Sequence, residues 1–186
     1  MNVPLDPPIS LINTLSLHAF NKVYYRQPLP AGKALTHFVP YFYPLDAIGE
    51  WNRIYGKKGF YQYQCVLPRA DAPRGVGDML AAIAESGEGS FLAVLKTFGQ
   101  MPSKGMLSFP RPGATLALDF PNRGESTAKL LARLDAIVRE CGGALYPAKD
   151  ARMSGDMFRL SYPGLEKFSA FVDPKFSSRF WRRVGN

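Results

Sequence analysis

Four polar side chains fall on the same face of three predicted strands. In the stretch 59–68, GFYQYQCVLP, the two-residue repeat of a strand places Gln62 and Gln64 together, opposite the tyrosines and the cysteine. Lys96 interrupts an otherwise apolar or small strand, and Thr115 starts the alternating run TLALDF. A face with amides, a lysine and few carboxylates is suited to a polar ligand, although a plain solvated sheet face would carry the same residues.

Lys149 is a further candidate because of where it lies in the chain. The stretch 145–154, LYPAKDARMS, starts as a short apolar strand and then brings Lys149, Asp150 and Arg152 close together. Taken alone, this composition favours a solvated turn after a strand. Lys149 becomes a site residue only if the surrounding fold directs it toward a ligand. Asp150 and Arg152 are expected to be structural, paired with each other or with another part of the protein.

The usual catalytic motifs are missing from the sequence. It has no glycine-rich dinucleotide or phosphate loop, no nucleophile elbow and no HExxH pair. His18 and His37 both lie in the N-terminal region, so a Ser-His-Asp set cannot be assembled. Cys65 and Cys141 lack metal-ligand spacing and are predicted to be reduced, core-facing thiols, so no metal is expected. We therefore expect that this chain alone is not a complete enzyme.

The chain of 186 residues carries a formal net charge of +8. An anionic partner would explain this charge, and so would a basic solvated surface or the lack of an acidic part of a larger protein. The stretch 58–66 superficially resembles an RNA-recognition motif, but Tyr61 stands where Gly or Ala is expected, so nucleic acid is not expected. No apolar run approaches the roughly 20 residues of a membrane span. We expect a cytoplasmic protein, with attachment to the inner face of the membrane as an alternative.

The elements that position these residues follow a β-α-β-β-α-β order. Helical spacing of apolar residues predicts helices over 76–86 and 126–143, the second capped by Ser126 or Thr127. Alternation and flanking turn residues predict four strands, over 59–68, 90–99, 106–121 and 144–148. This order is typical of the α+β, ferredoxin-like unit, whose antiparallel sheet has both helices on one face and leaves the other open. Outside this unit, an extended edge strand is predicted over 37–45 and a helix capped by Ser154 over 154–162.

Several ordered stretches carry a family resemblance. The most telling are YFYPLDAIGEWNRIYGKKGFYQYQCVLP, SFLAVLKTFG, LSFPRPGATLALDFP and GGALYPAKDARM. Together they resemble the C-terminal, substrate-domain half of FAD-linked oxidoreductases of the vanillyl-alcohol-oxidase type, and within that type the decaprenylphosphoryl-ribose 2-oxidase branch. The resemblance implies oxidation of a hydroxyl carbon by hydride transfer to flavin, with a small-molecule or lipid-linked sugar as substrate.

The resemblance also implies roles for individual residues. Gln62, Gln64 and Lys96 match residues that line the substrate pocket beside the flavin. Tyr146 and Lys149 match residues set against both flavin and substrate, and are the expected catalytic and cofactor-binding pair. Tyr43 is expected to help close the pocket.

The resemblance divides the chain into three parts. Residues 1–35 are expected to be a connector, residues 36–145 the substrate-binding (cap) domain, and residues 146–186 a tail that returns to an FAD-binding domain. That FAD-binding domain is missing from this sequence or is a separate chain, so the isolated chain is expected to retain no FAD and to be inactive. The alternative is a stand-alone module that binds RNA or a phosphorylated lipid on the open sheet face.

Overall fold

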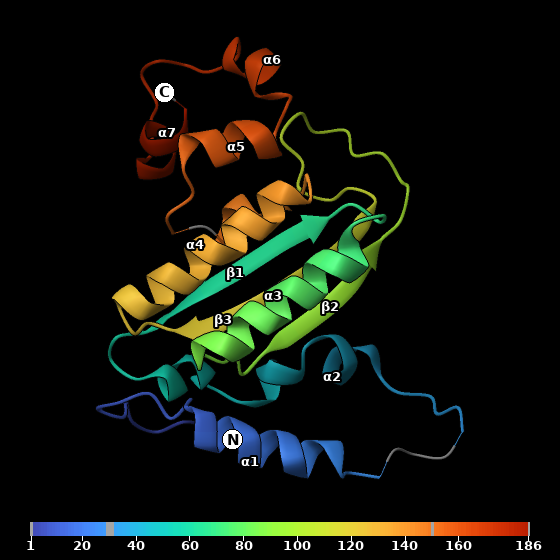
Figure 1. Cartoon of the computed structure of the whole chain (residues 1–186), viewed down its shortest axis with the longest axis vertical. Coiled ribbons are helices and arrows are strands. Elements are labelled where there is room, and N and C mark those ends of the chain that lie inside the picture. The colour runs from blue at the N-terminus through green and yellow to red at the C-terminus, as the bar shows by residue number, and fades with distance from the viewer. Residues whose placement is uncertain (1, 29–31, 150, 186) are drawn as a thin grey trace.

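The centre of the molecule is a four-stranded antiparallel sheet in the order β2-β3-β1-β4 (Figure 1). The computed structural model describes residues 2–28, 32–149 and 151–185. The strands are β1 (Phe60–Leu67), β2 (Ala93–Phe98), β3 (Gly113–Pro121) and β4 (Ala144–Leu145). The helices α3 (Ala72–Ser86) and α4 (Glu125–Glu140) connect them in the predicted order β1-α3-β2-β3-α4-β4. The predicted α+β class and antiparallel sheet are confirmed.

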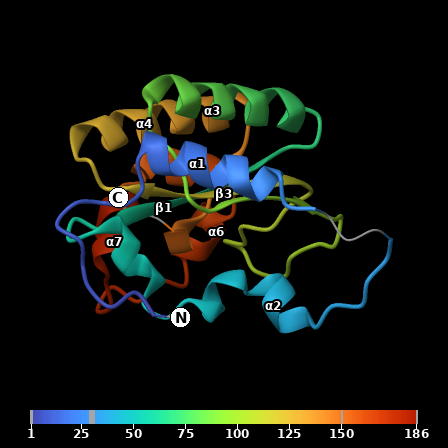
Figure 2. The same cartoon turned by 90° about the horizontal axis from the view of Figure 1, so that it is seen from below.

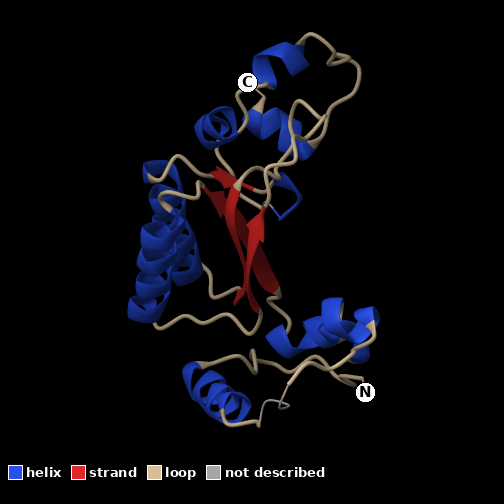
Figure 3. Ribbon diagram, turned by 90° about the vertical axis from the view of Figure 1, so that its right-hand side faces the viewer, coloured by secondary structure: helices blue, strands red, loops and turns tan. Residues whose placement is uncertain are grey.

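The two helices lie side by side on one face of the sheet (Figures 2 and 3). The apolar stripes of the two helices pack against every second residue of the strands, and together they form one hydrophobic core. The central buried side chains from this face are Tyr63, Cys65, Leu67, Met79, Leu116, Leu118, Leu131, Leu134 and Val138. Both cysteines are buried and free, as predicted.

Among the residues that the structure describes, no α-helix covers the other face of the sheet as α3 and α4 cover the first, and we call this the open face (Figure 3). Its residues follow from the register, because side chains directly opposite each other in an antiparallel pair share a face. Gln62 pairs with Asp119 and Gln64 with Ala117. Lys96 on β2 pairs with Thr115 on β3. The alternation predicted for the four polar residues is therefore observed.

The remaining elements lie at the two ends of the sheet (Figure 1). The N-terminal elements are α1 (Thr14–Tyr25), α2 (Phe38–Phe42) and the 3-10 turns η1 (Pro44–Ala47) and η2 (Trp51–Tyr55). The C-terminal elements are η3 (Pro147–Lys149), α5 (Gly155–Ser161), α6 (Leu165–Ser169) and α7 (Arg179–Val184). Ser154 caps α5 by accepting a hydrogen bond from the backbone N–H of Met157, as predicted. Phe158, Tyr162 and Val184 pack into the sheet core, so the tail is anchored to this domain.

The edge strand predicted over 37–45 is wrong, because Phe38–Phe42 is helical. The imidazole of His37 accepts a hydrogen bond from the N–H of Val39 and caps the first turn. Pro40 then occupies that first turn, where its missing N–H leaves no helix hydrogen bond unmade. Proline is compatible with an extended segment and with the first turn of a helix. The hydrogen bond to His37 stabilises the helical conformation here.

Other boundaries also differ from the prediction. The last strand, predicted over 144–148, covers only Ala144–Leu145 and is followed by η3. The long strand predicted over 106–121 starts only at Gly113, and the residues before it form a loop. Helix α4 starts after Gly124, so Ser126 and Thr127 lie inside its first turn and are not N-caps. Both hydroxyls instead bond the buried carboxylate of Glu88, which ties the first turn of α4 to the segment after α3.

Candidate functional site

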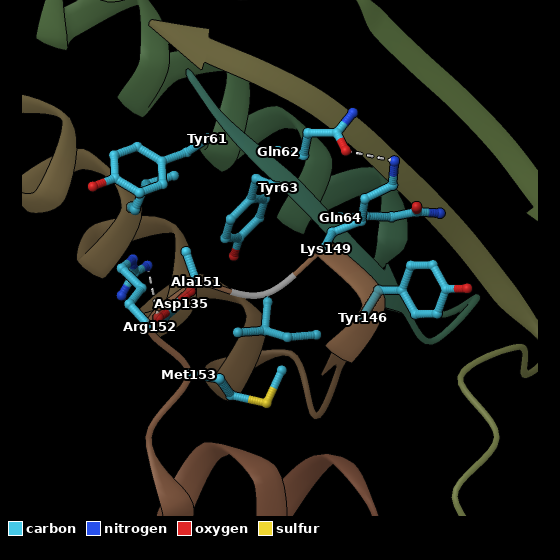
Figure 4. Close-up of a pocket in the computed structure, with 12 residues that line it drawn as sticks. Tyr61, Gln62, Tyr63, Gln64, Asp135, Tyr146, Lys149, Ala151, Arg152 and Met153 are labelled. Carbon is cyan, nitrogen blue, oxygen red and sulfur yellow. Dashed lines mark hydrogen bonds and ion pairs between the residues drawn. The ribbon is translucent and has the colours of Figure 1, made fainter. Parts of the chain in front are cut away.

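The open face carries a hydrogen-bonded pair of side chains at its centre. The Nζ atom of Lys149 donates to Oε1 of Gln62 over 2.9 Å. Figure 4 shows this pair with Gln64 and Tyr146 on one side of β1, while Tyr61 and Tyr63 point to the other side. The structure therefore brings together four of the six residues predicted for the site.

Lys149 reaches Gln62 because the chain turns across β1 at the end of β4. Leu145 pairs with Cys65, and the N–H of Tyr146 then donates to the carbonyl of Gln64 over 2.9 Å. The 3-10 turn that follows brings Lys149 back along β1 toward Gln62. Lys149 is thus half-buried and directed at Gln62 on the open face, and its role in a site stays a prediction.

Gln64 is held in one orientation by its neighbour on β3. Its Nε2 donates to Oγ1 of Thr115 over 3.1 Å, and Thr115 is fully buried. One end of the amide is therefore engaged within the sheet. The other end, Oε1, is the acceptor that Gln64 can offer to a ligand hydroxyl.

Tyr146 closes one end of the open face. Its ring stacks on Phe109 with centroids 4.5 Å apart and an interplanar angle of 26°. Both rings pack with Val66, Ala144 and Phe98 in a small second core. This end of the face is aromatic and fixed in shape, whereas the centre is polar.

The opposite end is closed by Tyr55, which stacks on Phe60 with centroids 4.4 Å apart. Phe60 lies on the same face as Gln62, two residues earlier in β1. Asp119 lies directly across from Gln62 and is only 3% exposed. Burial raises the pKa of Asp119, while a hydrogen bond from Gln62 and the positive charge of Lys149 oppose that rise.

Asp119 was not among the predicted site residues, although the alternation of TLALDF placed it on the same face as Thr115. Its burial could not be predicted from the strand pattern. It depends on η2, a segment that precedes β1 and has no periodic signal. The sequence signal that could have identified Asp119 is a carboxylate on a face otherwise poor in carboxylates.

Lys96 and Tyr43 lie farther from the pair. Lys96 is on the open face of β2, is exposed, and stands two strands away from β1. Tyr43 follows α2 and is 54% exposed. Among the described residues, no hydrogen bond joins Tyr43 to Gln62, Gln64 or Lys149.

Arg152 has a structural partner on the far side of β1 (Figure 4). Its guanidinium pairs with the carboxylate of Asp135 on α4 over 2.9 Å. The pair borders a cavity of about 30 Å³, which is room for a water molecule and not for a sugar or a ring system. Asp150, the other charge of this stretch, lies outside the described residues. A ligand larger than water does not fit in this cavity.

Comparison with known proteins finds similarity to one part of an oxidase. No protein-family model matches the chain. The chain is 35% identical over 182 residues to the decaprenylphosphoryl-beta-D-ribose oxidase of Mycolicibacterium smegmatis, a match that covers 95% of the chain and 39% of that oxidase. It is also 36% identical over 137 residues, 69% of the chain, to a Streptomyces coelicolor protein described as "Uncharacterized protein in mprA 5'region". The chain spans 39% and 36% of the lengths of these two relatives. The resemblance predicted from the sequence is confirmed.

No helix within the described residues is both long and apolar enough to cross a membrane.

Proposed function

We propose that the chain supplies the substrate-binding part of an FAD-dependent oxidoreductase that oxidises a hydroxyl carbon by hydride transfer. The observation that carries this proposal is the Lys149–Gln62 pair, held on an open sheet face beside Gln64. The identity of 35% to an oxidase, over 95% of the chain, supports the same function.

The side chains of the open face fit a flavin. The polar edge of a flavin ring system presents carbonyl and imine acceptors, and Lys149 offers an ammonium with three donors. Asp119 is only 3% exposed, so its carboxylate does not contact that edge directly. When bound, a flavin supplies the hydride acceptor. Tyr146 and Lys149 are the residues that we expect to contact it.

Lys149 would act as an electrostatic stabiliser. A positively charged donor beside a ring that gains an electron pair lowers the energy of the developing negative charge. The hydrogen bond to Gln62 orders the ammonium before any ligand arrives, so little reorganisation is needed during the reaction. Lys149 is therefore our candidate catalytic residue.

Gln64 and Lys96 would hold the substrate. Gln64 can accept a hydrogen bond from a sugar hydroxyl while Thr115 keeps its amide in place. Lys96 stands two strands away, about 10 Å at the usual strand spacing, on an exposed edge strand. That separation suits a sugar whose phosphate lies beyond the ring, which favours a lipid-linked sugar phosphate as substrate. We expect Tyr43, which follows α2 and is exposed, to help close the pocket.

An FAD-binding domain, in the same polypeptide or in a separate one, would cover the N-terminal helices. Helix α1 has no buried residue, and α2 has none either. Their exposed apolar side chains are Leu15, Phe20, Val23, Tyr24, Tyr25, Phe38, Val39, Tyr41 and Phe42. So much exposed apolar surface is characteristic of an interface. The tail would contribute Phe171 and Phe176, which are also exposed.

A hybrid enzyme tests the proposal. In it, this chain replaces the matching segment of the M. smegmatis oxidase. We expect the hybrid to bind FAD and to be bleached by decaprenylphosphoryl-ribose under anaerobic conditions. The isolated 186-residue chain, in contrast, should be colourless when purified. A yellow preparation of the isolated chain would contradict the need for a partner domain.

Lys149→Ala in the hybrid tests the residue assignment. We expect flavin reduction to slow by about 100-fold, the usual loss for one charge-stabilising donor. The matched control is Lys57→Ala, since Lys57 is an exposed lysine in the turn before β1. Reduction at the same rate in both variants, with FAD bound to both, would return Lys149 to the role of a solvated surface residue.

A further inference from the structure

Asp119 is a buried carboxylate that the proposed mechanism does not use. It lies on β3 directly opposite Gln62, and its Oδ2 atom has no hydrogen-bond partner among the residues that the structure describes. A buried polar atom without a partner lowers stability, so such an atom calls for an explanation. Its neighbours on the open face provide one.

The amide of Gln62 lies between two charged groups and can bind them in one order only. Its Oε1 atom accepts from the ammonium of Lys149. Asp119 stands directly across from Gln62, and an ionised carboxylate has acceptors and no donor, so it is the NH₂ group of Gln62 that can donate to Asp119. The three side chains form a row in which the amide of Gln62 has one favourable orientation.

We propose that Asp119 is a positioning residue: its carboxylate orients the Gln62 amide, and the amide oxygen in turn holds the Lys149 ammonium over the open face. This inference rests on the proposed function, because it assigns Asp119 to the site of that function. Without the carboxylate, the amide of Gln62 can rotate and present its NH₂ group to Lys149, which repels the ammonium.

The surroundings of Asp119 make the orientation of the Gln62 amide sensitive to pH. Burial raises the pKa of Asp119, and Lys149 and the Gln62 hydrogen bond act in the opposite direction. Among the described residues Tyr55 also faces Asp119, and burial together with Asp119 raises the pKa of Tyr55 well above its ordinary value. The backbone N–H of Asp119 is held by Ser90 on the neighbouring segment. A protonated Asp119 gains a donor, and the single order of the row is then lost.

Nuclear magnetic resonance on the intact 186-residue chain tests the inference without any flavin. We expect the side-chain NH₂ signals of Gln62 to shift with pH, with the same midpoint as the Cγ signal of Asp119 and above the ordinary value of 3.8. The NH₂ signals of Gln64, which is bonded to the neutral hydroxyl of Thr115, are the internal control and should not follow that midpoint. If Asp119 titrates and the Gln62 signals do not, the inference is wrong.

The Asp119→Asn variant provides the second measurement. We expect the titration of Gln62 to disappear, and the ammonium protons of Lys149 to exchange several-fold faster because the amide no longer holds them. Unchanged Gln62 and Lys149 signals in a folded Asp119→Asn chain would overturn the inference. A hybrid enzyme that fails to reduce flavin while these signals behave as expected would refute the proposed function alone.

Discussion

Removal of the Tyr162 hydroxyl tests how the segment that carries Lys149 is held in place. Tyr162 follows α5, is 1% exposed, and donates from its hydroxyl to the carbonyl of Leu145 over 2.7 Å. The preceding residue, Ser161, accepts from the N–H of Leu145 over 3.3 Å. Two consecutive side chains therefore bond both backbone polar groups of the last residue of β4. We expect Tyr162→Phe to destabilise the end of β4, from which the chain turns toward Lys149.

The structure allows the size of this effect to be estimated. The ring of Tyr162 keeps its contacts in the variant, namely Phe158 at 5.0 Å and the guanidinium of Arg111 at 5.5 Å. No cavity is created, so the loss is that of one hydrogen bond and of the partner for a buried carbonyl. That loss is worth about 1–3 kcal/mol. For a chain of this length, it corresponds to a melting temperature lower by about 2–12 °C.

Urea unfolding followed by circular dichroism measures the difference. The matched control is Tyr25→Phe, since Tyr25 is 92% exposed and loses only a solvated hydroxyl. We expect the control to lie within about 0.5 kcal/mol of the wild type. Equal stabilities of Tyr162→Phe and Tyr25→Phe would refute the idea that α5 anchors β4 through this hydroxyl.

Two further predictions concern backbone space and charge. Gly113→Ala should lower the free energy of unfolding by about 3 kcal/mol in a urea titration, because its Cβ would clash with the carbonyl of Leu67 and its φ of 156° is strained for other residues. Gly77→Ala, inside α3 with nothing within 4 Å of the added Cβ, should raise stability by about 0.4–1 kcal/mol, and the opposite ranking would contradict this reading. Because burial raises the pKa of Asp119 above 3.8, the folded chain binds that proton more tightly than the unfolded chain. The stability of the wild type relative to Asp119→Asn should therefore fall as the pH rises from 3.8 through the folded pKa, and a constant difference between pH 4 and 7 would argue against a raised pKa.

The strictly periodic parts of the sequence predicted the structure well. The alternation around Gln62 and Gln64 gave the correct faces of β1, since a strand that buries one face cannot slip by one residue without exposing its core. The apolar stripe of α4 likewise predicted the buried residues Leu130, Leu134 and Val138. The order of these elements was enough to predict an open face.

The parts without a period were predicted less well. Residues 37–45 contain aromatic residues and a proline, which suit an edge strand and a capped helical turn equally, and the hydrogen bond from Val39 to His37 decides between them. The pairing of Lys149 with Gln62 joins residues 87 positions apart. No local pattern contains it, because it depends on how the last strand adds to β1 and where the chain turns afterwards. The resemblance to a family placed both residues in one site, and their hydrogen bond is a finding of the structure.

The row Asp119–Gln62–Lys149 explains why a buried carboxylate lies under a basic face. Ordering a lysine side chain costs about 1.5–2 kcal/mol of conformational entropy, and a hydrogen bond to a charged group is worth about 1.5–3 kcal/mol. These two contributions nearly cancel, so Gln62 can hold Lys149 only if no further entropy is lost in orienting its amide. We propose that Asp119 fixes that orientation beforehand. The carboxylate lowers stability at neutral pH because it is buried, yet it prepares the ammonium for its task before a ligand binds. In Asp119→Asn, the free energy of unfolding at pH 7 should therefore increase. At the same time the side chain of Lys149 should become less ordered. A variant that gained stability and kept Lys149 ordered would show that Gln62 alone positions the lysine.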